Sequence, residues 1–305
     1  MEPDYSRALQ AEGGIPQPGS LIRAVHSLYR DEFLRWFGIM APTSLLSGLV
    51  LILADLRIRA IFRSIPLGEI RHHFVEIAVA DALRFGGFFL SWLLGCFALA
   101  AIATVVNSLN EADDNAEAWR HDSYEEARKH LGALFVTALI TFCAFLVGAL
   151  GVEIVDLAVV RVVGWTRFSP FNYFFTVAGF VVVGSIVSWW AIAVPLIVGG
   201  NIKMRTALRK SVQLSSGYEG ALFLLVTESV AGGLIAWYVT LHGMALLVPE
   251  HLRYTAWYGW FVNVVGVLAS AAVDPPLFIG LSVLVDPKRH NATSIPVAQE
   301  AADIH

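Results

Sequence analysis

The sequence has few charged residues, only two cysteines and none of the short motifs that mark common metal sites. Charged residues make up 15% of the chain, against about 25% in typical soluble proteins. The cysteines form no C-x-x-C pair, and no Cys/His cluster has the spacing of a zinc or iron–sulfur site. The net charge is −4, which gives no basic surface for nucleic acid. We therefore expect no cofactor, no metal and no nucleic-acid partner.

Catalytic motifs are missing as well. The chain contains no H-E-x-x-H, no G-x-S-x-G and no P-loop, and nothing in it resembles the selectivity filter of a channel. These absences favour a protein that is not an enzyme. Residues 1–19 are polar and turn-rich without an apolar core, so we expect a flexible segment there and no cleavable signal peptide. Residues 288–305 lack apolar periodicity and predict a disordered cytoplasmic tail.

Long apolar runs are the dominant feature of the chain, which is 56% hydrophobic. About 20 apolar residues in a helix cross a hydrocarbon core of roughly 30 Å. The sequence therefore predicts an all-α integral membrane protein, with six transmembrane helices and short amphipathic interfacial helices in a membrane domain over residues 20–287. Cys96 and Cys143 lie inside these runs, where we expect both to be buried. The predicted spans are 37–56, 85–109, 131–160, 171–200, 221–248 and 256–285.

The distribution of lysine and arginine predicts the orientation. Thirteen of these residues lie on the side of the N-terminus and eight on the other side, so the positive-inside rule places both termini in the cytoplasm. Five of the eight belong to residues 57–84, whose apolar residues are spaced as one helical face. This long connection predicts an amphipathic helix on the outer membrane surface, with a re-entrant segment as the alternative.

The connection between the fourth and fifth spans predicts a short basic amphipathic helix at the cytoplasmic interface. Met204, Leu208 and Val212 share one face, and Gly217 ends the segment. Basic residues near a membrane surface bind anionic headgroups with about 1 kcal/mol each. The alternative is a topology determinant without a specific ligand. The basic residues fill the other faces: Lys203, Arg205, Arg209 and Lys210.

Ionisable residues inside the spans are functional candidates because charge in lipid is costly. Glu228 lies eight residues into the fifth span and requires either protonation or a partner on a facing helix. Glu153 and Asp156 lie three residues apart near the outer end of the third span. They either present both carboxylates on one face or extend outward to the interface, which we favour.

Asp274 is a further candidate because it precedes two prolines within the sixth run. Pro275 and Pro276 lack backbone donors, so they break or kink that helix. The carboxylate at the break either holds a cation or accepts hydrogen bonds from freed backbone N–H groups, and we favour the second interpretation.

A weak internal repeat supports a different function. Tyr124-Glu125 precedes Gly132-Ala-Leu-Phe, and Tyr218-Glu219 precedes Gly220-Ala-Leu-Phe. In both places a span, a short helix and another span follow each other. Both copies would have the same orientation, as in the parallel repeats of some transporters.

Several short motifs resemble a broad prokaryotic family that includes the membrane domain of some glycerophosphodiester phosphodiesterases and its stand-alone relatives. The resemblance implies a six-span fold with an N-terminal surface helix, in the inner membrane of a bacterium. It does not imply phosphodiesterase activity, because no soluble segment is long enough to hold that catalytic domain. The chain also has Gly199-Gly200-Asn201 where the family often has an acidic residue. The matching residues are Pro195, Ala207-Leu-Arg-Lys-Ser211, Leu214, and Asp286 before Lys288 and Arg289.

The sequence thus supports three hypotheses of function. The leading one is a non-enzymatic inner-membrane protein that organises the membrane by binding lipids or a membrane protein partner. The alternative is a transporter of a lipid or an amphipathic solute. A third, an intramembrane enzyme, requires at least two of the four intramembrane carboxylates to converge.

Overall fold

The computed structural model describes residues 18–63, 73–108, 119–163, 170–200, 202–253 and 256–285. Within these ranges the chain is helical and forms no strand. Both the all-α membrane class and the six predicted spans are confirmed. The segments that are long and apolar enough to cross a membrane are Phe33–Arg63, Phe74–Ser108, Leu131–Val162, Tyr173–Gly200, Glu219–Leu247 and Tyr258–Val283.

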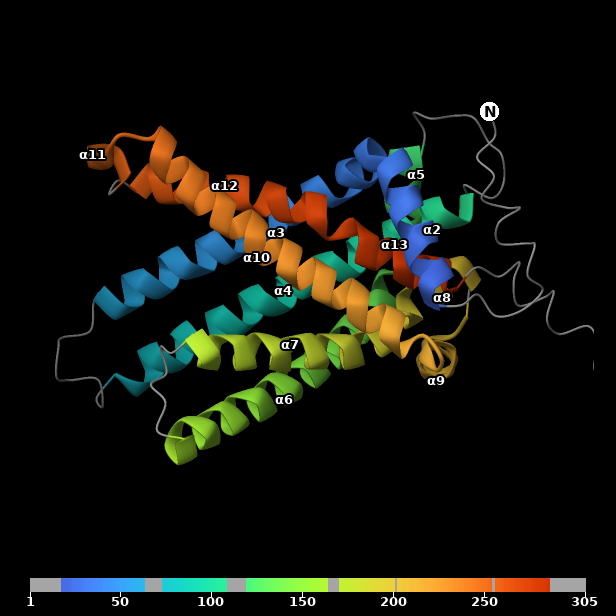
Figure 1. Ribbon diagram of the computed structural model, residues 1–305, viewed down its shortest axis with the longest axis horizontal. Helices are drawn as coiled ribbons and strands as arrows, with labels where there is room; N and C mark the ends of the chain where they lie inside the picture. The colour runs from blue at the N-terminus through green and yellow to red at the C-terminus, as the bar shows by residue number, and fades with distance from the viewer. Residues whose placement is uncertain are drawn as a thin grey trace, which may run out of the picture.

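The long helices form a bundle with short helices at its two ends. Figure 1 shows α2, α5 and α9 at one end, called the α9 end below, and α11 at the opposite end. The short helices are α2 (Pro18–Asp31), α5 (Trp119–Lys129), α9 (Met204–Ser215) and α11 (Glu250–Arg253). The long ones are α3 (Phe33–Arg63), α4 (Phe74–Ser108), α6 (Leu131–Val163), α7 (Pro170–Ala191) with α8 (Ala193–Gly200), α10 (Glu219–Leu247), and α12 (Ala256–Val273) with α13 (Pro275–Val283).

The separate surface helix expected over residues 57–84 is not formed by the described residues. α3 continues to Arg63 and α4 begins at Phe74, so the described parts of this connection extend the two spans. The charges on the α3 extension pair along the helix, with Arg59 Nε 2.7 Å from an Asp55 carboxylate oxygen one turn away. Such local pairing lets a charged sequence continue a helix beyond the apolar core. The region 64–72 lies outside the described residues.

The sixth span is interrupted at its two prolines, as predicted. α12 ends at Val273 and α13 begins at Pro275. Asp274 nevertheless keeps helical dihedrals, φ −73° and ψ −27°. Its backbone N–H donates to Ser270 at 3.0 Å, and its carbonyl accepts from Leu277 at 3.2 Å. The prolines therefore divide the helix without unwinding it, because a proline in a first turn removes donors that would be unpaired anyway.

Much of the buried core lies toward the α9 end. There α2 packs its apolar face, with Leu21 and Val25 fully buried, against α10 and α13. The helix predicted for this N-terminal segment is therefore confirmed. Of the two cysteines, Cys96 is buried but Cys143 is exposed on α6, so the expectation that both are buried was wrong for Cys143. Of the predicted flexible segment 1–19, Pro18 and Gly19 belong to α2 and the rest lies outside the described residues. The predicted disordered tail, 288–305, and the motif positions 286–289 also lie outside them.

Candidate functional site

The predicted basic helix exists as α9, and its most buried face consists of small residues. Ala207, Ser211 and Ser215, one turn apart, face the bundle, where α9 contacts α7 and α8. Small side chains allow helices in a membrane protein to approach closely. The hydroxyl groups of Ser211 and Ser215 donate to backbone carbonyls three residues earlier, at 2.8 and 2.9 Å, so their burial leaves no unpaired donor.

The predicted apolar face of α9 is only partly covered. Met204 and Leu208 are half-buried against the core, whereas Val212 is 41% exposed. The predicted end of the segment is confirmed, because Gly217 has φ +94° and its N–H donates to a Glu219 carboxylate oxygen at 2.9 Å. Glycine adopts this left-handed conformation without steric cost.

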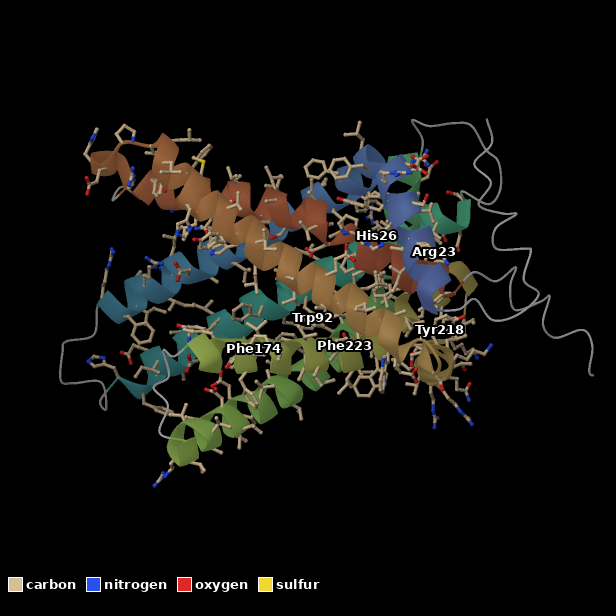
Figure 2. The ribbon with its side chains drawn as sticks, in the orientation of Figure 1. Arg23, His26, Trp92, Phe174, Tyr218 and Phe223 are labelled. Carbon is tan, nitrogen blue, oxygen red and sulfur yellow. The ribbon has the colours of Figure 1, made fainter. Side chains whose placement is uncertain are left out.

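All four basic side chains of α9 are exposed, and none forms an ion pair within the described part of the chain. The neighbouring interfacial helix differs, since on α5 the Lys129 ammonium is 2.6 Å from Glu126. Figure 2 shows nitrogen-tipped side chains that extend from α9 away from the bundle. Among the described residues, α9 and its N-cap therefore present four basic side chains without an ion pair: Lys203, Arg205, Arg209 and Lys210.

Glu228 has a partner that sequence reasoning missed. Its carboxylate oxygen lies 2.8 Å from His26 Nε2 on α2, and the other ring nitrogen of His26 lies 2.8 Å from the Ile22 carbonyl oxygen. The Tyr29 hydroxyl group, one turn further along α2, donates to the Ala272 carbonyl. The partner of Glu228 thus comes from a surface helix and not from a facing span. The available signal was the position of His26 beside Val25, on the apolar side of α2.

The geometry around His26 favours its protonated form. Both ring nitrogens face acceptors, and only the imidazolium donates from both. Burial lowers the pKa of His26, but the hydrogen bond to Ile22 and the hydrogen bond and charge of Glu228 more than offset this effect. The net result is a pKa above the ordinary histidine value.

The attachment of α2 is therefore predicted to depend on pH. A raised pKa in the folded state gives stabilisation that is complete below the ordinary value of about 6.5 and lost as pH rises through the raised value. Because the two side chains are 42% and 43% exposed, we expect the thermal midpoint to fall by only a few degrees over this window.

The measurement is the thermal unfolding midpoint of the wild type and of His26→Gln, in the same detergent from pH 5 to 9. In His26→Gln, the decrease of the thermal midpoint with pH that the wild type shows above neutrality should be absent. His242→Gln is the matched control, since the contacts of His242 among the described residues stay within its own helix: a hydrogen bond to the Tyr238 carbonyl at 3.0 Å and stacking on the Tyr238 ring. A slope in His26→Gln that equals the wild-type slope contradicts the prediction.

Asp274 does not use its side chain to cap α13, so the favoured interpretation was wrong. The reason is local. Pro275 and Pro276 have no N–H, and the next donor, Leu277, is used by the backbone carbonyl of Asp274. The carboxylate instead accepts a hydrogen bond from Ser229 of α10 at 2.8 Å.

Asp274 also lines a cleft of about 260 Å³ between α3, α4, α10 and α12. Ser229 follows Glu228 in the chain. Glu228 of α10 and Asp274, at the break between α12 and α13, therefore lie in the same part of the bundle. Each is bonded to a different partner. The polar lining of the cleft is Thr43, Ser44, Ser47, Ser91, Ser270 and Asp274.

The remaining two candidates lie elsewhere, on α6. Glu153 is exposed, whereas Asp156 is 6% exposed and accepts a hydrogen bond from Thr176 of α7 at 3.3 Å. The expectation that both extend outward was wrong for Asp156, because the α6–α7 interface encloses it and supplies a donor. The four carboxylates therefore do not share one site.

These features define a polytopic α-helical membrane protein with an exposed basic helix at one end and a carboxylate-lined cleft between its spans. No protein-family model matches the chain, and no match was found among curated proteins or solved structures. The resemblance to the membrane domain of glycerophosphodiester phosphodiesterases stays a prediction.

Proposed function

We propose that the protein is a non-enzymatic, lipid-binding component of a bacterial inner membrane, and that it holds anionic lipid headgroups at α9. The observation that supports this most is the set of four exposed basic side chains that have no ion pair within the described residues. Lysine and arginine are in excess on the side of the membrane that is predicted to hold both the N-terminus and α9, which supports a cytoplasmic location for α9.

The helix geometry also favours an anion. Lys203 is the N-cap residue of α9, and the first turn contains no acidic residue. The positive end of the helix dipole and two of the basic side chains therefore lie together, which favours a phosphate. Arginine adds paired donors that match phosphate oxygens. The buried serine face fixes the backbone of α9 on the bundle, so lipid binding does not require this helix to become ordered.

The test is replacement of all four basic residues of α9 by glutamine. At about 1 kcal/mol per charge, we expect selectivity for phosphatidylglycerol over phosphatidylcholine to fall by up to about a thousandfold at low salt. Selectivity can be measured from the quenching of tryptophan fluorescence by brominated forms of each lipid in reconstituted vesicles.

A matched variant removes four arginines at the opposite end of the bundle, where some of them are already paired with aspartate. It should keep the wild-type selectivity, since it changes the net charge equally but leaves α9 intact. Equal selectivity in the wild type and the α9 variant contradicts the proposal. The control residues are Arg57, Arg59, Arg63 and Arg84.

Transport of an amphipathic solute is the second candidate. The cleft lined by Asp274 favours it, because transporters bind substrate between their helices and use intramembrane carboxylates. Glu228→Gln is expected to leave lipid selectivity unchanged, and loss of solute uptake in that variant would favour transport.

A further inference from the structure

The cleft exists because small residues leave space between four helices. A Cβ atom at Gly95 of α4 would meet no atom within 4 Å, so this glycine borders open space. On the opposite wall, a Cβ atom at Gly266 would lie 2.5 Å from the Trp237 indole. The missing side chain of Gly266 therefore lets the indole of α10 lie against α12 and form part of the lining.

The polar groups of the cleft divide into two sets. The Ser47 and Ser91 hydroxyl groups bond to each other, and the Thr43 hydroxyl group donates to the Met40 carbonyl at 2.9 Å. The second set has unused capacity within the described residues: the hydroxyl groups of Ser44 and Ser270, and the Asp274 carboxylate oxygen that Ser229 does not reach. The cleft thus offers acceptors, one of which belongs to a carboxylate.

We propose that this cleft binds an alkylammonium ion, a primary amine on a short aliphatic chain, with its charge on Asp274. An ammonium group has three donors and no acceptor, which matches the unused oxygens. A carboxylate away from water is stabilised by an opposite charge in contact with it. The Trp237 ring, which lies against Gly266 about two helical turns before Asp274, would cover part of the alkyl chain. This site is distinct from the headgroups proposed for α9.

The size and the apolar walls distinguish this ligand from a metal ion. Met40, Leu51, Val267 and Phe278 line the cleft and would cover an alkyl chain. A volume of about 260 Å³ is slightly below the range of roughly 300–1,000 Å³ for drug-sized ligands. It therefore fits an ammonium group with several carbons, whereas a bare hard cation would fill little of it and requires about six oxygen ligands.

The experiment is equilibrium dialysis of radiolabelled hexylammonium against the full-length protein in phosphatidylcholine nanodiscs, with empty nanodiscs to subtract partition into lipid. The wild type should bind saturably. Asp274→Asn should bind at least tenfold more weakly, because it keeps an oxygen for Ser229 but removes the charge. Asp156→Asn is the matched control and should bind like the wild type, since it neutralises a buried aspartate outside the cleft.

Competition in the wild type tests the proposal without relying on any variant. Unlabelled hexylammonium should displace the label, whereas hexan-1-ol and Na⁺ at the same concentration should not. The variant that lacks the four basic residues of α9 should bind hexylammonium like the wild type. Non-saturable binding to the wild type, equal binding to Asp274→Asn, or equal displacement by hexan-1-ol or Na⁺ would overturn the proposal.

Discussion

A Gly280→Leu variant is expected to lose about 3 kcal/mol or more of stability and to release α2 from the bundle. Gly280 lies in α13, where a Cβ atom would be 2.5 Å from Leu225 Cδ1 and 3.6 Å from Val25 Cγ2. Both neighbours are buried, at 1% and 0% exposure, so neither can move into open space. A leucine side chain must therefore push α2 and α10 away from α13.

Two measurements check this prediction. The thermal midpoint in detergent should fall, and trypsin should cleave after Arg23 or Arg30, which are exposed on α2 but part of a docked helix in the wild type. Gly220→Leu is the control, because a Cβ atom at that exposed position of α10 would meet no atom within 4 Å. A Gly280→Leu protein that melts and resists trypsin like the control contradicts the prediction.

The spans and the short helices α2, α5 and α9 could be predicted because their signals are local. An apolar run long enough for a membrane, or a basic segment between two runs, can be recognised without knowing what it contacts. The extensions of α3 and α4 were misassigned because apolar spacing alone does not distinguish a surface helix from the end of a long span. The spacing of Asp55 and Arg59, which form an ion pair one turn apart, indicates that α3 continues as a helix beyond its apolar part.

The contacts between helices could not be predicted from local patterns. His26 and Glu228 are 202 positions apart, and nothing in either segment indicates the other. The face of α9 that packs on the bundle cannot be read from its large apolar residues, which indicate only an amphipathic helix at an interface. In a membrane protein the large residues can face lipid, while small ones such as Ala207 and Ser211 make the close contact.

The glycine at position 199 also has a structural reason. A Cβ atom at Gly199 would lie 2.3 Å from the Asn107 amide nitrogen of α4. The side chain of Asn107 therefore occupies the space that a larger residue at position 199 would need. This contact explains why glycine suits the end of α8, which sequence reasoning treated only as the replacement of an acidic residue.

Trp36→Ala is expected to be the most destabilising of the single substitutions at the corner between α2 and α3. The Trp36 side chain is fully buried, and its indole N–H donates to the Leu28 carbonyl of α2 at 3.0 Å. Truncation of a buried tryptophan costs about 3–5 kcal/mol, and the lost indole hydrogen bond adds about 1 kcal/mol, although the Leu28 carbonyl still accepts from the Glu32 N–H at 3.1 Å. Trp36→Phe keeps most of the volume but loses the hydrogen bond, so its cost should be about 1–2 kcal/mol.

The ranking can be measured by unfolding the variants in mixed detergent micelles, with Trp260→Ala as a control because Trp260 is 46% exposed. The pH dependence of the unfolding midpoint distinguishes a variant that has only lost the packing of Trp36 from one in which α2 no longer docks on the bundle. If Trp36 holds α2 in place, Trp36→Ala must also lose the contribution of His26, since His26 reaches Glu228 only when α2 is docked. Trp36→Phe should keep it. A Trp36→Ala protein that is destabilised yet retains the wild-type pH slope would show that α2 docks independently of this corner.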